Sequence, residues 1–285
     1  MQLRPEGRGG GSRTREVSAG RLEAGSYYGS VRGVFATPLA RVCCVSHDRG
    51  RALPEHDHAL AYFCMLLEGS YTESVAGRSI DYAPFQASFH PACMPHRDAV
   101  GARGACFLCV ELEAAPLEEA GVRLRADAAP LAGDVSMSLL RVHRALARRT
   151  LSDLELEGAV WDLCGALGRG LSNAERGTPA WLGRVLEIVE EEHGEALTVA
   201  SIARRVGVHP VHASREFRRR YRQTIGEYLN KVRIRSACAR ISRGGESLAQ
   251  VAHASGFADH AHFCRVFKSA VGCTPSEFAL LRYSM

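Results

Sequence analysis

One short helical pattern occurs twice towards the C-terminal end of the sequence, between Leu197 and Phe278. The copies align at an offset of 49 residues up to the turn and of 50 residues after it. In each copy a hydroxyl residue precedes an apolar stripe of helical spacing, and a glycine then permits a turn with positive φ. The repeat therefore predicts two helix-turn-helix units in an all-α C-terminal domain. The matched positions include Thr198/Ser247, Val199/Leu248, Ile202/Val251, Ala203/Ala252, Gly207/Gly256, Arg215/Arg265, Thr224/Thr274 and Glu227/Glu277.

The second helix of each copy has an outer face on which a partner can bind. By helical spacing, Phe217 and Phe267 lie on the inner faces. On the outer faces, arginine can bind guanine through two hydrogen bonds, and histidine can donate to base acceptors or phosphate. A phosphate contact without sequence information is the alternative for both base-contacting arginines. The candidate DNA-binding residues are Val211, His212, Arg215, Arg219, His260, His262, Arg265 and Lys268, with Arg219 and Lys268 assigned to phosphates.

A longer helix is predicted between the two copies. It opens at Thr224 with the capping box Thr224 to Glu227 and continues to about Arg243. Twenty helical residues span about 30 Å, which is close to one turn of B-DNA, about 34 Å. One chain is therefore expected to place its two second helices in adjacent major-groove segments of double-stranded DNA.

The charge distribution favours a polyanionic partner for this region alone. Residues 197–285 hold 15 lysines and arginines against 5 aspartates and glutamates, whereas residues 1–196 hold 21 against 26. A basic module on an acidic body is typical of nucleic-acid binding by the module.

Three segments resemble the AraC/XylS-type transcription regulators: Val206 to Tyr221, Ile225 to Ala237 and Gly256 to Phe278. The resemblance covers a continuous stretch of about 90 residues, with both copies in the order that the family has. The resemblance implies a sequence-specific transcription regulator, controlled by a small effector that the sequence does not identify. It also implies activation, with RNA polymerase as a partner.

The N-terminal half has the pattern of many short strands from about residue 30 to residue 112, which predicts a small sandwich or barrel. Within it, Gly50, His56, His58, Tyr62 and Gly69 have the spacing of the first cupin motif, with Tyr62 in place of glutamate. Pro91 and His96 resemble the second motif, with Phe85, Cys93 and Val100 at its glycine and asparagine positions. The resemblance implies a cupin-like effector-binding barrel, and the candidate ligand-binding residues are His56, His58, Tyr62 and His96.

Two other functions remain open for this half. His56, His58 and His96 could form an open three-imidazole metal site, which would make the protein a metal-sensing regulator. Against this, the carboxylate of the cupin motif is missing, so we expect no metal and no other cofactor. The second alternative is a cupin enzyme fused to a DNA-binding module, and here we expect no enzymatic activity.

Between Ala114 and Ser172 the pattern changes to amphipathic helices. Two of them, joined near Thr150, predict an antiparallel hairpin. The family resemblance implies that this hairpin, from Val135 to Leu171, forms a homodimer. The alternative is a hairpin that packs only on its own barrel.

The whole sequence thus predicts an α+β chain of two domains. We expect a disordered tail at 1–25, a cupin-like effector-binding and dimerisation domain at 26–172, a linker at 173–178 and a double helix-turn-helix domain at 179–285. The chain has no apolar run long enough for a bilayer and no apolar leader. With ten scattered cysteines this predicts reduced thiols, a cytoplasmic, nucleoid-associated location and no membrane partner.

Overall fold

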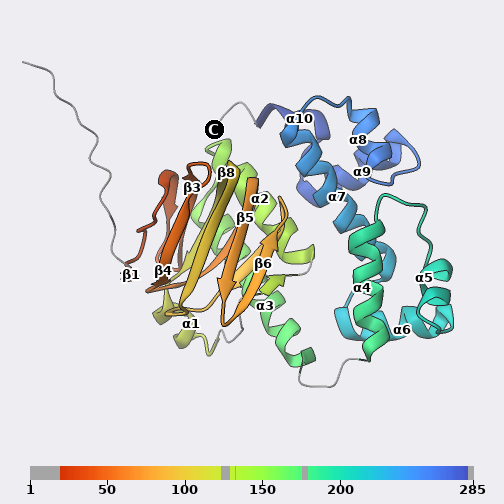
Figure 1. Ribbon diagram of the computed structural model, residues 1–285, viewed down its shortest axis with the longest axis horizontal. Coiled ribbons are helices and arrows are strands. Elements are labelled where there is room, and N and C mark those ends of the chain that lie inside the picture. Colours follow the sequence, from red (N-terminus) through yellow and green to blue (C-terminus); the bar gives the residue numbers. More distant parts are fainter. Residues whose placement is uncertain (1–19, 123–128, 132, 175–178, 282–285) are drawn as a thin grey trace, which may run out of the picture.

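A computed structural model describes residues 20–122, 129–131, 133–174 and 179–281. Figure 1 shows a strand-rich part beside a helical part, with helix α7 running between two groups of helices. The N-terminal half is β-rich and the C-terminal half is helical, as the sequence predicts. Among the described helices, none combines the length and the apolar composition that a membrane span requires.

One nine-stranded sheet makes up most of the N-terminal half. Its long strand β8 pairs with β5 along most of its length, with β3 at its C-terminal end and with β4 at its N-terminal end. None of the pairings between described strands closes the sheet into a ring, and we call it the half-barrel; the closed cupin barrel stays a prediction. The strands are β1 (Gly20–Leu22), β2 (Ser30–Ala36), β3 (Ala40–His47), β4 (Ala52–His58), β5 (Ala61–Val75), β6 (Arg78–Tyr82), β7 (Ala87–His90), β8 (His96–Leu112) and β9 (Ala129–Leu131).

The two faces of the half-barrel differ because successive side chains of a strand alternate between them. On β5, Phe63 and Met65 belong to a large apolar core that includes two helices, α2 (Gly133–Ala147) and α3 (Asp153–Ala174). Tyr62 and Cys64 lie on the opposite, inner face. The inner face is where the polar residues of the sheet collect.

Two expected boundaries are wrong. Residues 20–25 do not belong to a tail, because β1 pairs in parallel with β4 and Leu22 is buried against Tyr28 and Leu53. The expected linker at 173–178 begins too early, since α3 runs to Ala174. Extending an existing helix by a few residues costs little free energy, so polar composition alone did not mark its end. Residues 1–19 and 175–178 lie outside the described part of the chain. The segment between Ala114 and Ser172, predicted to be helical, also contains a strand, β9, which pairs with β7.

The helical half follows the repeat closely. Thr198, Thr224 and Ser247 each form a capping box at the predicted helix starts, and Asp259 caps the helix that begins at His260. Gly207 and Gly256 have φ values of 72° and 87° at the two turns. The remaining helices are α1 (Ala114–Glu119), α4 (Ala180–Glu192), α5 (Val199–Arg205), α6 (Pro210–Tyr221), α7 (Ile225–Arg243), α8 (Leu248–Ala254), α9 (His260–Val271) and α10 (Pro275–Leu281).

The helical half is divided between two apolar cores. Helices α4, α5, α6 and the start of α7 share one core around Phe217, and we call them the first helical unit. The end of α7 with α8, α9 and α10 forms the second helical unit. Its core, around Phe263 and Phe267, is continuous with the core between the half-barrel and α2–α3. Only the second unit is therefore built into the N-terminal half.

Polar contacts reinforce this attachment. Arg141 and Arg144 on α2 donate to the backbone oxygens of Ala270 and Gly272 at the end of α9. On the sheet side, the ring of Phe85 lies 5.9 Å from that of Phe278 in α10. The second unit is thus held both by hydrogen bonds at α9 and by aromatic packing at α10.

Candidate functional site

The outer faces of α6 and α9 carry the predicted DNA-binding residues. On α6, Val211 is 69% exposed and the Arg215 side chain 74% exposed, and both lie opposite the fully buried Phe217. On α9, Arg265 is exposed opposite the fully buried Phe267. Cationic and apolar side chains thus project from both helices, an arrangement that suits contact with phosphates and base edges.

Three of the predicted histidines have neighbours within their own helical unit. The His212 ring lies 5.6 Å from that of Trp181 on α4. His262 is only partly exposed, with its ring edge-on to Phe257 at 5.6 Å. His260 is exposed and lies beside Cys264, one turn further along α9.

Glu216 is a functional neighbour that the sequence reasoning missed. It accepts hydrogen bonds from Arg219 at 2.6 and 2.9 Å, and its other oxygen lies 3.8 Å from Nε of Arg215. The three-residue spacing of Glu216 and Arg219 on a helix was the available signal. Arg219 must exchange this ion pair for a phosphate if it contacts DNA.

The outer face of α9 borders a cleft. Arg265 and His262 line this cleft of about 650 Å³ between α9, α7 and the hairpin α2–α3. The opposite wall includes Arg141 on α2 and Asp162 on α3. The hairpin therefore stands close to the outer face of α9.

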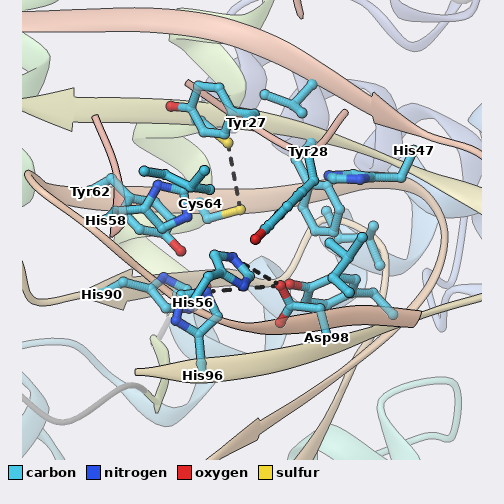
Figure 2. Close-up of a pocket in the computed structure, with 18 of the residues that line it drawn as sticks. Tyr27, Tyr28, His47, His56, His58, Tyr62, Cys64, His90, His96 and Asp98 are labelled. Atoms are coloured by element: carbon cyan, nitrogen blue, oxygen red, sulfur yellow. Dashed lines mark hydrogen bonds and ion pairs between the residues drawn. The ribbon is translucent and has the colours of Figure 1, made fainter. Parts of the chain in front are cut away.

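The second candidate site is a cavity on the inner face of the half-barrel, with a volume of about 40 Å³. Figure 2 shows histidine, tyrosine and aspartate side chains from several strands converging on it. We call it the inner cavity. Its lining residues are Leu22, Tyr27, Tyr28, Val45, His47, Leu53, His56, His58, Tyr62, Cys64, Leu66, Tyr71, Tyr82, Ser88, His90, His96, Asp98, Phe107 and Cys109.

The four predicted ligand-binding residues do come together here. Strand register places His56 opposite His96, with ring centroids 4.3 Å apart. His58 lies 4.7 Å from Tyr62 by the same measure. All four are buried. Tyr62, at the motif's glutamate position, stacks on His90 at 4.5 Å.

Two buried carboxylates also line or adjoin the cavity, and sequence reasoning missed both. Asp98 lies two residues after His96, so the alternation of a strand places both on one face. Glu73 faces Asp98 across the β5–β8 pair. Glu73 accepts hydrogen bonds from His90 at 3.0 Å and from Tyr82 at 2.8 Å. The position of Asp98 was recoverable from alternation; that of Glu73 required the strand register.

Burial controls the protonation of the inner cavity. It lowers the pKa of His58 to about 2 and, together with neighbouring histidines, lowers the pKa of His56 and of His96. It raises the pKa of Asp98 to about 6. Burial would also raise the pKa of Glu73, but the hydrogen bonds from His90 and Tyr82 outweigh it and lower that pKa. At neutral pH the cavity therefore holds neutral imidazoles beside carboxylates.

Cys106 and Cys109 lie three positions apart on β8 and point to opposite faces, as alternation requires. Cys109 lines the inner cavity, while Cys106 borders cavities on the other side of the sheet. The Sγ atoms of Cys64 and Cys109 lie 4.0 Å apart across β5 and β8.

Comparison with known proteins identifies the helical half. Residues 202–280 match the family model described as a helix-turn-helix domain. The chain carries an AraC-type helix-turn-helix domain. The uncharacterized HTH-type transcriptional regulator YijO of Escherichia coli is 30% identical over 112 residues, which are 39% of each chain. The uncharacterized HTH-type transcriptional regulator YobQ of Bacillus subtilis is 24% identical over 86% of this chain and 97% of its own length.

A solved structure of a transcriptional regulator with an AraC-type DNA-binding domain, from Chromobacterium violaceum, is similar to the AraC-type domain of this chain. It is 24% identical, covers 36% of this chain and 92% of its own, and has a TM-score of 0.35. Several curated relatives are matched over less than half of their own length. The matched part in those relatives is 91 to 134 residues long.

Proposed function

We propose that the protein is a sequence-specific DNA-binding transcription regulator in which α6 and α9 contact adjacent major-groove segments. The observation that carries the proposal is the pair of helices with exposed outer faces at the two ends of α7, within an AraC-type domain. Recognition helices of helix-turn-helix proteins contact base edges from such faces.

The length of α7 suits the placement of α6 and α9 in adjacent major-groove segments. Ile225–Arg243 is 19 residues, or about 28 Å at 1.5 Å per residue. One turn of B-DNA rises about 34 Å, so two helices separated by this rod can approach the same side of the duplex. Arg215 and Arg265, at matched positions of the two copies, are the proposed base contacts. Val211, His212, His260 and His262 are proposed to complete the two contact faces.

The test uses the full chain. Genomic fragments enriched by binding to the purified protein give the target sequence, and a base-substitution scan then measures each position. We expect Arg215→Ala and Arg265→Ala each to cost about 1–3 kcal/mol of binding free energy, at positions about ten base pairs apart. If Arg265→Ala leaves affinity and sequence preference unchanged, α9 does not contact bases and the two-groove proposal fails.

Arg219→Ala is the matched control on the same helix as Arg215. Because Arg219 is proposed to contact a phosphate, as Lys268 is on α9, its loss should weaken binding to all sequences alike. It should also reduce the slope of log affinity against log salt concentration by about one, which corresponds to one released counterion. A loss confined to one base position would instead make Arg219 a base contact.

We propose that the half-barrel is a cupin-like domain that binds a small effector in the inner cavity, near His56, His58, Tyr62 and His96. Support comes from Phe85 and Cys93, which adopt φ values of 63° and 59° at two positions where the cupin motif has glycine. Non-glycine residues rarely adopt this conformation. Retention of the backbone shape without the glycines is consistent with a cupin origin.

We also propose homodimerisation through α3 and activation of transcription with RNA polymerase. Leu154 and Trp161 on α3 are 81% and 40% exposed, and seven residues place them on one helix face. The α2 side of the predicted interface is largely buried in the core of the same chain.

A promoter fused to a reporter gene tests whether the protein activates or represses transcription. Expression should rise with the protein present, and a fall would make it a repressor.

A further inference from the structure

Three cysteines form a row across neighbouring strands on the inner face of the half-barrel. Strand register places Cys109 on β8 opposite Cys64 on β5, and it also places Cys109 opposite Cys43 on β3. All three side chains are buried, and they belong to one apolar cluster. The central thiol of the row therefore has a possible partner on either side.

The structure distinguishes the two possible pairs. The Sγ atoms of Cys64 and Cys109 lie 4.0 Å apart, and a dashed line joins them in Figure 2. Within the described part of the chain, no such contact joins Cys109 to Cys43. Cys64 and Cys109 both line the inner cavity, whereas Cys43 is not among the described residues that do so. The pair Cys64 and Cys109 thus combines close sulfurs with a place on the cavity wall.

The backbone of this pair already has the spacing of a disulfide bond. Directly opposite residues of an antiparallel pair have Cα atoms about 4.5–5.5 Å apart. Disulfides occur at Cα separations of about 4.4–6.8 Å, so the two strands need little movement. The sulfurs must approach from 4.0 Å to about 2.05 Å, which rotation of the two side chains can supply.

The size of the inner cavity selects the oxidant that can reach these thiols. The cavity measures about 40 Å³, and one buried water needs about 10–15 Å³ by the same measure. Hydrogen peroxide has two oxygen atoms and needs about the room of two waters. Organic molecules of drug size occupy pockets of about 300–1,000 Å³ and do not fit.

We propose that Cys64 and Cys109 are a modification site at which hydrogen peroxide forms a reversible disulfide bond. The sulfur of Cys64, which is 8% exposed against 4% for Cys109, attacks one peroxide oxygen. The O–O bond breaks, and the departing hydroxide leaves as water with the proton of the Cys64 thiol. This step oxidises Cys64 to a sulfenic acid.

The second step closes the disulfide bond. The sulfur of Cys109 attacks that of Cys64, the S–O bond of the sulfenic acid breaks, and a second water leaves with the Cys109 proton. In total, the two thiols lose two electrons and one peroxide is reduced to two waters. The contact with Cys64, together with burial, raises the pKa of Cys109 well above its ordinary value. Because the thiolate is the nucleophile, this step is slow and the sulfenic acid accumulates before the disulfide.

The bond would alter the inner cavity beside a proposed effector contact. Cys64 lies two residues from Tyr62, so both side chains are on the same face of β5. Drawing the sulfurs of Cys64 and Cys109 together changes the wall next to Tyr62. An influence of the disulfide on an effector rests on the proposed function; the formation of the disulfide does not.

The test uses the full wild-type chain, first reduced and then freed of reductant. It is treated with excess hydrogen peroxide while folded, its free thiols are blocked, and it is digested without reductant for mass spectrometry. We expect one peptide pair joined through Cys64 and Cys109, which dithiothreitol separates again. A pair joined through Cys43 and Cys109 would overturn the assignment. So would a folded chain without a disulfide between Cys64 and Cys109.

Two variants test the order of the steps. Cys109→Ser should abolish the bond and leave Cys64 as a sulfenic acid, which dimedone traps. Cys43→Ser is the matched control, because Cys43 flanks Cys109 in the same row, and it should form the bond at the wild-type rate. If dimedone instead labels Cys109 in a Cys64→Ser chain and never Cys64, the assigned roles of the two thiols are wrong.

Specific DNA binding is measured on the same reduced and oxidised samples. Specific DNA binding by a chain that forms no disulfide would reject the thiol pair and leave the regulator standing. A disulfide between Cys64 and Cys109 in a chain without sequence preference for DNA would reject the regulator and leave the thiol pair standing.

Discussion

The matched glycines of the two turns offer a test of how the helical units are joined. Gly207 and Gly256 both have positive φ, so alanine at either position is strained by about 1–2 kcal/mol. At Gly207 an added Cβ meets nothing within 4 Å. At Gly256 it would lie 2.2 Å from the backbone oxygen of His193 and 2.8 Å from Nε of Arg233. A Cβ at Gly256 would therefore overlap the end of α4 and Arg233 on α7, whereas a Cβ at Gly207 would project into open space.

The contacts set the expected difference. Overpacking of this kind costs about 1–3 kcal/mol. Arg233 would also lose its hydrogen bonds to the backbone oxygens of His193 and Glu195, both 2.9 Å, each contributing about 1 kcal/mol. We therefore expect Gly256→Ala to lower the free energy of unfolding by about 4–7 kcal/mol, against about 1–2 kcal/mol for Gly207→Ala.

Urea denaturation of the full chain, followed by circular dichroism, measures both variants. Arg233→Ala separates the lost contacts of Arg233 from the steric overlap, because it removes the two hydrogen bonds and the contact with the Phe257 ring without adding a Cβ at the turn. Equal costs for Gly207→Ala and Gly256→Ala would refute the reasoning, since the two differ only in what surrounds the turn. So would a Gly256→Ala cost no greater than that of Arg233→Ala.

Three further predictions concern other parts of the molecule. Burial lowers the pKa of His143 to about 4, below the ordinary value of 6.5, so this residue stabilises the fold above pH 6.5 and the contribution is lost as the pH falls towards 4. The contribution that is lost amounts to about 3 kcal/mol of the free energy of unfolding. In denaturation measured across this pH range, the free energy of unfolding of His143→Leu should therefore change by about 3 kcal/mol less than that of the wild type. Leu154→Lys with Trp161→Lys should convert the full chain from dimer to monomer in sedimentation at about 10 μM, and a wild type that is already monomeric there would reject the interface. Glu216→Gln should free Arg219 and raise DNA affinity several-fold with a steeper salt dependence, whereas unchanged affinity would mean that the ion pair persists on DNA.

Local signals were sufficient to predict the helical half from the sequence. The hydroxyl residues at Thr198 and Ser247, the capping box at Thr224 and the glycines of the turns act within a few residues, and each is found in its expected place. The repeat also predicted which aromatic residues would be buried, because both copies place phenylalanine at the same helical position. The bases that the outer faces would contact are beyond what these local rules describe.

Contacts between distant segments could not be predicted in the same way. Asp98 and Glu73 meet only through the register of β5 and β8, which bends around two irregularities. Arg141 and Arg144 look like an ordinary solvated helix face in the sequence, yet they bind residues 129 and 128 positions away. The motif histidines were found because the spacing within a motif is local, whereas Glu73 was missed because its place beside them depends on the register of distant strands.

The core beneath the second helical unit is continuous with the core of the N-terminal half. The domain that the sequence defines therefore does not coincide with a unit that folds by itself. A chain cut near residue 178 would retain the whole AraC-type domain, yet it would uncover apolar side chains of α7, α9 and α10 that now pack on α2 and Phe85. Such an exposed patch favours aggregation. In the intact chain, hydrogen exchange should protect the second half of α7 together with the half-barrel, and its first half together with α4. The first helical unit can then open by itself while α9 stays anchored, so α6 and α9, the two helices proposed to contact DNA, would differ in local stability.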